Sequence, residues 1–512
     1  MSQTPSPTVP PADSDQDTEL ARDAGWRRLD ARMLLVHPVT ELVRFLPLIV
    51  GVFLLGSSNQ GDPWHYLGVL VPIALGLWRF AITSFRITRG QIELRRGLLS
   101  RNVLTAPLDR VRTVELTASP IHRLLGLAKV EIGTGSASRS GDSRLVLDSL
   151  GVEHARRLRA ELLNRVSVAS GAPPPEQHRP DAEQVIMRLD PSWVRYAPLT
   201  TSGIVIALAT LGAGSQLVDN LVQRAARSSH LDERVRALPL AVAIPAGVVT
   251  FVVVVSVLAI GGYVLTNWGF TLSRDATGRS FHVRRGLLTT RETSIDVDRL
   301  RGLEVHEPLG LRLGGGGRLN AVATGLNRRA ADRTTLVPAA PRAVVLGVGE
   351  HVLGEAGPLT TPLVSHGPAA RRRRVLRGVV PLALVPLGLG LLAALGPLPI
   401  WVALATLPLP VAGLGLGLDR YARLGHALTP AYVVVRWGSL RGRRDALQRS
   451  GIIGWNLRQS WFQRRAGLVS LTATTAAGQQ SYEILDVPEG IAVALADAAV
   501  PGLVGQFLSP AG

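Results

Sequence analysis

The amino-acid sequence predicts an α+β membrane protein in which three pairs of apolar helices alternate with three strand-rich modules. The chain has six apolar stretches, and most of them approach the roughly 20 residues that a helix needs to cross a bilayer. They occur in pairs, and each pair is followed by a polar segment in which apolar and polar residues alternate. Several phrases of these polar segments also recur along the chain, which indicates that one unit has been repeated.

The composition fits a membrane protein with a basic surface. Of the 512 residues, 46% are hydrophobic and 18% are charged, and the mean hydropathy is +0.23. The formal net charge of +18 is carried by arginine, since Lys129 is the one lysine. Such an excess favours contact with anionic surfaces, whether lipid headgroups or nucleic acid. The chain has no cysteine, which excludes disulfides, thiolate metal sites and a cysteine nucleophile.

The apolar stretches predict three transmembrane hairpins. They lie at 42–56 and 65–83, at 199–218 and 238–265, and at 379–396 and 400–418. With their flanks the hairpins occupy 23–85, 185–265 and 375–418. The alternative, buried helices of a large soluble protein, is disfavoured because runs such as AVAIPAGVVTFVVVVSVLAIGGYVL are uncharged and apolar on every face.

Arginines at the hairpin ends predict the orientation. Basic residues precede the first and fifth helices and follow the second, and the positive-inside rule makes these flanks cytoplasmic. The loop 219–237 also carries arginines, but acidic residues offset them. We therefore expect a multi-pass protein of the cell membrane with both termini and all three modules in the cytoplasm. Residues 1–22 have no apolar core and are expected to form a disordered tail, not a signal peptide.

Each polar segment is expected to form a module of strands that ends in a helix. The modules span 86–168, 266–356 and 419–506, and linkers lie at 169–184 and, strongly basic, at 357–374. Each begins with short alternating runs such as FRITRGQIELRRGLL, which is typical of strands. The final helices are SLGVEHARRLRAELLNRV, with Ser149 as the expected N-cap, a weaker PRAVVLGVGEHVL, and PEGIAVALADAAV.

The modules are internal repeats. RRGLL at 95–99 recurs at 284–288 and, more loosely, as RWGSL at 436–440. LDRVRTVEL at 108–116 returns at the same spacing as VDRLRGLEV at 297–305, and its expected third copy is LQRSGIIGW at 447–455. Because order and spacing hold over such a long period, these are duplicated domains and not a solenoid.

These phrases, preceded by paired membrane helices, resemble bacterial membrane proteins with pleckstrin-homology-like (PH-like) domains. The entry phrases WRRLDARMLLVHP and VIMRLDPSWVRY also match that family. The resemblance implies that each module is a small PH-like β-barrel closed by its C-terminal helix. The third copy departs most, because it lacks the RRGLL turn and the Asp-Arg pair. The resemblance implies no phosphoinositide site.

The sequence carries no catalytic motif. It lacks Walker A, HExxH, GxSxG and CxxC patterns, so we expect no enzyme activity, no cofactor and no metal. His351 and Glu355 have helical spacing but no third ligand. The glycines at 314–317 are expected to form a strand turn. Gly413, Gly415 and Gly417 would let the sixth membrane helix approach its neighbour closely.

Two groups of side chains are candidates for function. Arginines near the membrane exit of the first two modules are candidate lipid or partner contacts, each worth about 1 kcal/mol beside an anionic leaflet. These are Arg86, Arg89, Arg95, Arg96, Arg284 and Arg285. The alternative, that they only set topology and solvate strands, stays open. Asp109–Arg110 and Asp298–Arg299 recur at one place in two repeats and are interpreted as a structural pair inside a strand.

These observations support a non-enzymatic membrane scaffold whose cytoplasmic modules bind proteins. The expected partners are membrane lipids and a protein, for which a shorter member of the same family is one option, and an oligomer is compatible with the pattern. The alternative function is anionic-lipid sensing or envelope-stress protection through basic module faces. Transport is disfavoured because the apolar stretches carry almost no charge. Nucleic-acid binding is disfavoured because no helix-turn-helix or stacking platform is present.

Overall fold

The structure is a computed structural model, and it describes the chain in segments. Described are residues 113–133, 144–155, 158, 183–203, 205–207, 209, 240–324, 334–396 and 398–503, and the backbone of strands at 27–28, 83–87, 91–96 and 102–107. The chain divides into two compact units, residues 1–180 with 288–294, and residues 181–287 with 295–512. Each unit is described by itself.

The first unit contains the first repeat. Its strands β1 (Arg27–Arg28), β2 (Thr83–Ile87), β3 (Gln91–Arg96) and β4 (Asn102–Pro107) form an antiparallel sheet in that order, with β4 at the edge. A second group follows: β5 (Thr113–Ala118), helix α4 (Pro120–Leu124), β6 (Leu127–Gly133) and β7 (Arg144–Gly151). Ser149 lies inside β7 and helical residues begin only at Val152, so the predicted N-cap at Ser149 is wrong.

The outer edge of β5 is occupied by a strand from the second repeat. Strand β11 (Thr290–Asp296) pairs antiparallel with β5, with Thr290 opposite Ala118 and Thr293 opposite Glu115. The paired residues of β11 belong to the first compact unit, although they come far later in the sequence. The first repeat is therefore completed by a strand of the second.

The second repeat begins in the second unit with β8 (Gln184–Arg188), β9 (Thr271–Arg274) and β10 (Ser280–Arg285), each paired to the next. After η4 (Val297–Arg299) come β12 (Leu300–Pro308), α9 (Leu309–Leu313), β13 (Gly316–Ala323), β14 (Thr335–Pro341) and α10 (Arg342–Leu353). The predicted final helix is thus well formed, and Gly354 ends it in the left-handed conformation.

The third repeat follows the same order of elements. It runs β15 (Gly425–Leu428), β16 (Tyr432–Trp437), β17 (Arg441–Gln448), η6 (Arg449–Gly451), β18 (Ile452–Arg458), α14 (Trp461–Arg464), β19 (Leu468–Thr475), β20 (Ser481–Pro488) and α15 (Glu489–Ala499). Strands β18, β19 and β20 form a three-stranded sheet. The predicted final helix at PEGIAVALADAAV is confirmed as α15.

The second and third repeats share one six-stranded sheet. Its order is β14-β13-β12-β17-β16-β15, so the second repeat's β12 pairs with the third repeat's β17. The pairings among the described strands do not close this sheet into a barrel. Instead, β15 to β17 contribute to two hydrophobic cores: Val433 and Val435 pack toward α15, whereas Val434 and Ala446 pack toward the second repeat. This alternation follows from the two-residue period of a strand.

The register of the third repeat differs from the sequence-based alignment. Turn η6 takes the place of η4, and the β-bulge at Leu300/Gly302 recurs at Ile452/Gly454. The counterpart of 297–305 is therefore 449–457, two residues later than the predicted 447–455. Gly454 is thus the counterpart of Gly302, and the error arose because the bulge that fixes the register has no clear sequence signal.

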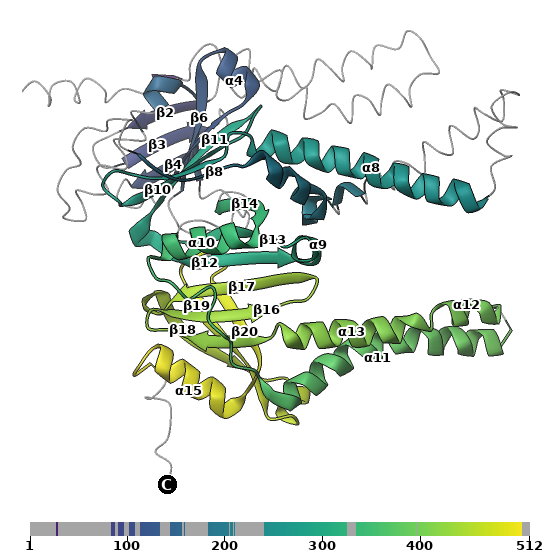
Figure 1. The fold of residues 1–512 in the computed structure, drawn as a ribbon. Coiled ribbons are helices and arrows are strands. Elements are labelled where there is room, and N and C mark those ends of the chain that lie inside the picture. Colours follow the sequence, from purple (N-terminus) through teal and green to yellow (C-terminus); the bar gives the residue numbers. More distant parts are fainter. Residues whose placement is uncertain are drawn as a thin grey trace, which may run out of the picture. The chain divides into compact units, whose positions relative to one another are not determined.

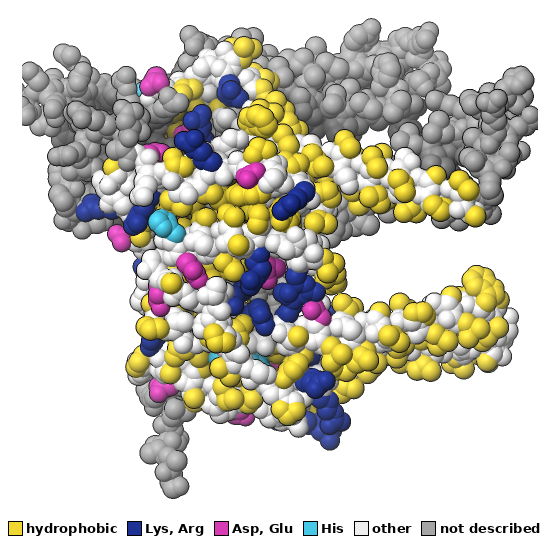
Figure 2. Space-filling view, in the orientation of Figure 1, with side chains coloured by type: hydrophobic (Ala, Val, Ile, Leu, Met, Phe, Trp, Pro, Cys, Tyr) yellow, Lys and Arg dark blue, Asp and Glu magenta, His cyan; other side chains and the backbone are white. Residues whose placement is uncertain are grey.

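Three helices in the described part of the chain are long and apolar enough to cross a membrane. They comprise α8 (Leu240–Asn267), α11 (Gly367–Ala394), and α12 (Ile400–Ala405) with α13 (Pro408–Ala422). In the second unit, α8 and the α11–α13 pair project from the same side of the strands (Figure 1). Hydrophobic side chains cover them along their length (Figure 2). The first predicted helix, the second except for its last residue Thr83, which begins β2, and most of the third lie outside the described residues.

Glycines bring α11 and α13 into close contact, as the sequence predicted for two of them. A Cβ at Gly378 would lie 2.4 Å from the Gly413 carbonyl oxygen, and one at Gly417 would lie 2.7 Å from the Val375 Cα. Gly415 has open space instead. The glycines of 314–317 form the predicted turn into β13, where a Cβ at Gly316 would meet the Tyr196 ring at 2.7 Å.

Candidate membrane-interface site

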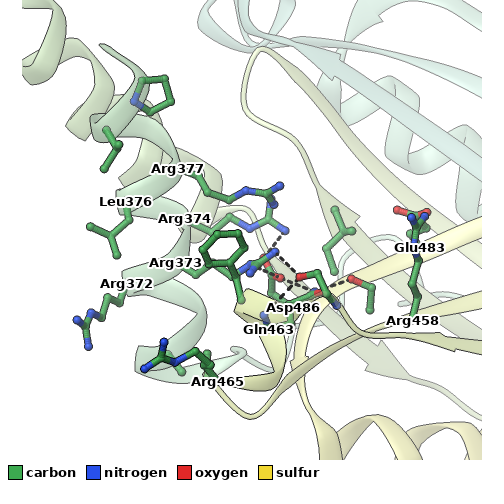
Figure 3. Close-up of a pocket in the computed structure, with 18 of the residues that line it drawn as sticks. Arg372, Arg373, Arg374, Leu376, Arg377, Arg458, Gln463, Arg465, Glu483 and Asp486 are labelled. Atoms are coloured by element: carbon green, nitrogen blue, oxygen red, sulfur yellow. Dashed lines mark hydrogen bonds and ion pairs between the residues drawn. The ribbon is translucent and has the colours of Figure 1, made fainter. Parts of the chain in front are cut away.

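A groove lies where α11 meets the strands of the third repeat. It has a volume of about 1120 Å³ and is lined by the first turns of α11, by α14 and by β19 and β20. Figure 3 shows Arg373 and Arg374 of α11 extending toward Asp486, whereas Arg372 points away from this carboxylate. Because α11 is apolar beyond this point, the groove lies at the level where the helix would leave a bilayer.

Two of its arginines bind one buried carboxylate. Arg373 Nε is 2.9 Å from Asp486 Oδ1, and Arg374 Nη2 is 2.7 Å from Asp486 Oδ2. Asp486 is only 1% exposed and has a φ of 54°, a conformation that Asp tolerates better than most residues. The double ion pair therefore fixes the start of α11 to β20 in one orientation.

The same carboxylate also organises α14. Gln463 Nε2 donates to Asp486 Oδ1 at 2.9 Å and to Ser470 Oγ at 2.8 Å. Gln463 and Ser460 form a capping box at the start of α14. As a result, the aromatic pair that follows Ser460 is held beside the start of α11.

Four further arginines leave their charges available to a ligand. Arg372, Arg377, Arg458 and Arg465 line the groove and are exposed, and no carboxylate in the described residues lies within ion-pair distance of them. Arg465 stacks over the Trp461 ring, 5.0 Å from its centroid. Guanidinium groups suit planar, bidentate recognition of phosphate, so this cluster matches an anionic headgroup.

An exposed aromatic pair lies next to these charges. Trp461 and Phe462 on α14 are 60% and 70% exposed, and their rings pack edge to face with centroids 5.0 Å apart. Large aromatic rings at the surface are typical of a membrane–water interface. Together with the arginines they form a surface that is apolar and cationic, as a lipid headgroup region requires.

Two buried histidines lie beneath the groove. His366 Nδ1 donates to the Leu485 carbonyl at 2.9 Å, and His366 Nε2 is 2.8 Å from His426 Nδ1. Because Nδ1 of neutral His366 is the donor, its Nε2 accepts and His426 Nδ1 must donate. Burial and the neighbouring His426 lower the pKa of His366 to about 4, and burial lowers the pKa of His426. Both rings are therefore neutral at pH 7.

A second polar cluster lies buried at the junction of β12 and β17. Arg443 Nη2 donates to Glu304 Oε1 at 2.8 Å, and Arg443 also contacts Asp445. Tyr482 donates its hydroxyl proton to the same Glu304 oxygen at 2.8 Å. Burial raises the pKa of Glu304, but its hydrogen bond to His306 and the Arg443 charge outweigh burial, and the pKa lies below its usual value. The ion pair crosses between repeats and fixes the register of the shared sheet.

The residues singled out from the sequence lie elsewhere or are not described in full. Arg284 is exposed and Arg285 is buried on β10. Arg86, Arg95 and Arg96 lie in described strands, but their side chains, and all of Arg89, Asp109 and Arg110, lie outside the described residues.

The expected structural pair is not in a strand in the second repeat. Asp298 and Arg299 lie in the turn η4, where Arg299 approaches Asp296 at 3.9 Å and the Asp298 backbone N–H donates to Asp296. The groove residues were missed because 371–374 were interpreted only as topology signals. The WFQRR run, two aromatics followed by two arginines, is the sequence signal that marks α14.

Comparison with known proteins identifies the repeated unit. The family model described as "Bacterial PH domain" matches residues 39–166, 222–354 and 379–497. No curated protein and no solved structure matches the chain significantly. In the described residues, no group of three or more His, Cys, Asp or Glu side chains is arranged to hold a metal ion. The three matches cover most of the chain, which therefore belongs to the bacterial PH domain family and carries the domain three times.

Proposed function

We propose that this protein is a non-enzymatic membrane scaffold that presents three PH-like modules to protein partners at the cytoplasmic surface. The observation that carries the proposal is the pairing of sheet edges between repeats. Strand β12 of the second repeat takes β17 of the third as its neighbour over seven paired positions. Main-chain hydrogen bonds at a sheet edge are a common way to bind another protein. Modules that bind each other in this way present the same kind of edge to partners.

The scaffold proposal is tested by removing the modules and keeping the anchors. The full chain and a variant that lacks 86–168, 266–356 and 419–506 are purified from crosslinked membranes, and the attached proteins are identified. We expect the partners to be lost with the modules, because tethering raises the effective concentration only while a binding surface exists. Membrane fractionation controls for insertion. If the bare hairpins retain every partner, the proposal is wrong.

A second candidate function, recognition of anionic lipids, is favoured by the groove beside α11. Its exposed arginines and the aromatic pair on α14 suit a phosphate headgroup and the acyl region below it. Each arginine near an anionic leaflet contributes about 1 kcal/mol. The sequence-based version of this idea named arginines of the first two repeats, whereas the described groove lies in the third.

Charge reversal tests lipid recognition. Arg372→Glu combined with Arg465→Glu should lower the amount of anionic phospholipid that copurifies with the full chain by about tenfold. The matched control is Arg441→Glu, since Arg441 is also exposed but does not line the groove. Lipid extraction and mass spectrometry measure the ratio of anionic to zwitterionic lipid. An unchanged ratio in the double variant would exclude the groove as a lipid site.

A further inference from the structure

Two junctions between repeats are built in the same way. At the first, β5 of the first repeat pairs with β11 of the second, and Glu115 lies opposite Thr293. At the second, β12 pairs with β17, and Glu304 lies opposite Asp445. Glu115 and Glu304 are counterparts in the repeat alignment, and so are Thr293 and Asp445. Both junctions therefore have the same register.

The first and third repeats each contain one strand of the kind that forms these junctions but has no described partner at the corresponding edge. Strand β18 is the counterpart of β5 and β12, yet β19 is its single partner among the described strands. Strand β4 is the counterpart of β11 and β17, and it lies at the edge of its sheet with β3 as its described partner. The two strands are complementary but lie at opposite ends of the sequence.

The free edge of β18 has the features that β12 uses to accept a neighbouring strand. Leu457 is 44% exposed, whereas its counterpart Val305, covered by β17, is 1% exposed. At Gly302 a Cβ would lie 2.1 Å from the Ala446 carbonyl oxygen, so the glycine admits the neighbouring strand. Its counterpart in β18 is also a glycine, Gly454, although nothing lies within 4 Å of a Cβ placed there. An exposed apolar edge of this kind is a template for another strand.

The polar residues of β18 and β4 differ from those of the two filled junctions, and both strands have the same replacement. In the filled junctions the acidic residue of one strand faces an arginine two positions along the other, as Glu304 does with Arg443, and Glu115 and Arg291 occupy the same places. The counterpart of the acid on β18 is Asn456, and the counterpart of the arginine on β4 is Asn102. Two asparagines can satisfy each other through amide hydrogen bonds. An asparagine that faced the glutamate or the arginine of a filled junction would instead leave that buried charge without a counter-charge.

We propose that β18 of one copy pairs with β4 of a second copy, so that the chain assembles head to tail in the register of its internal junctions. This inference rests on the proposed scaffold function and names its partner. The register places Leu457 opposite Val103 and Asn456 opposite Leu104. Because the contact joins two different surfaces, it is heterologous, and repeated addition builds a ring or an open array of copies. The junction between the second and third repeats keeps their membrane helices on the same side of the strands, and the proposed contact between copies has the same register (Figure 1).

Cysteine crosslinking tests the register, because the chain has no cysteine of its own. Two tagged copies are expressed together, one with Val103→Cys and the other with Leu457→Cys, and membranes are oxidised. Residues directly opposite in an antiparallel pair have Cα atoms about 4.5–5.5 Å apart, within the range of a disulfide. The matched control replaces Leu457→Cys by Ile453→Cys, since Ile453 is even more exposed, at 63% against 44%, but lies about 13 Å further along the strand.

The charge pair provides a rescue that a misfolded variant would not show. In the copies that carry the cysteines, Asn456→Glu should lower the yield of the mixed crosslink by about tenfold, because the carboxylate would be buried without a cation. Adding Asn102→Arg to the other copy should restore the yield by recreating the pair of Glu304 and Arg443. The proposal is overturned if no mixed crosslink forms while both thiols react with a maleimide, or if the Ile453→Cys control crosslinks as well. Should partners of the scaffold test still copurify in that case, the scaffold stands and self-pairing alone is refuted.

Discussion

The second and third repeats have the same succession of elements but differ at their edges and at their anchors. In the second repeat, β12 is covered on both sides, and α8 is held by a neutral contact in which the Tyr263 hydroxyl donates to the Ala339 carbonyl at 2.8 Å. In the third repeat, β18 has one described neighbour, and α11 is held by two arginines on Asp486. The difference shows that the same strand of the fold is an internal link in the second repeat and a sheet edge in the third, which is the edge of the proposed assembly.

The largest expected contrast is between the counterpart glycines. Gly302→Val should reduce the free energy of unfolding by about 4 kcal/mol or more, because the side chain would collide with the backbone of β17 and because φ is +154° there. Gly454→Val should change it by about 0.5 kcal/mol or less, since nothing lies near its Cβ. Chemical unfolding in detergent micelles measures both. Equal losses would mean that the edge of β18 at Gly454 is covered in the same way as the edge of β12 at Gly302.

Removing the charge of Asp486, which holds α11, should reduce the free energy of unfolding more than removing the Tyr263 hydrogen bond, which holds α8. Asp486→Asn keeps the side-chain shape and the tolerance for positive φ but leaves Arg373 and Arg374 without a counter-charge, which should cost about 3–5 kcal/mol. Glu483→Gln, an exposed carboxylate of the same groove, is the control and should be nearly neutral. A loss of less than about 1 kcal/mol for Asp486→Asn would show that the ion pairs do not fix α11.

The histidine pair makes the third repeat sensitive to acid. In the unfolded chain a histidine binds its proton near pH 6.5, whereas burial and His426 lower the pKa of folded His366 to about 4. Between these values the unfolded state binds more protons, so stability falls as the pH drops from about 6.5 and the loss is complete below about 4. For His366 alone the loss reaches about 3 kcal/mol.

The pH effect is isolated by comparison with a variant. Unfolding is measured from pH 7 to pH 4 for the native chain and for His366→Gln with His426→Gln, and the two curves are subtracted to remove the contribution of carboxylates such as Glu304. A flat difference curve would show that the histidines titrate alike in the folded and unfolded states.

Apart from the control variants, the smallest loss of stability is expected at the neutral anchor of the second repeat. Tyr263→Phe removes the hydroxyl that donates to Ala339 and keeps the ring, which is 8% exposed. The free energy of unfolding should fall by about 1 kcal/mol, the usual net value of one hydrogen bond plus the cost of an unpaired carbonyl. An effect as large as that of Asp486→Asn would remove the contrast between the two anchors.

The sequence was sufficient for what local patterns encode and insufficient for what distant segments build together. Alternation after each hairpin predicted the entry strands, as β9 and β10 confirm, and periodicity predicted α10 and α15. The pairing of β12 with β17 could not be predicted, because strand edges carry no local label for their neighbours. The groove was missed for the same reason, since Asp486 lies far along the chain from the arginines of α11 that it binds.

If sheet edges are the binding surfaces of these modules, one complex should contain more than one copy of the chain, and this number can be counted in single complexes. The full chain with a fluorescent tag at its C-terminus is counted by stepwise photobleaching in membrane-derived nanodiscs, beside Gly454→Val. Pairing of β18 with β4 predicts complexes of two or more copies for the native chain and single copies for the variant, whose fold is kept because its Cβ has open space. The same distribution of copies for both proteins would contradict it.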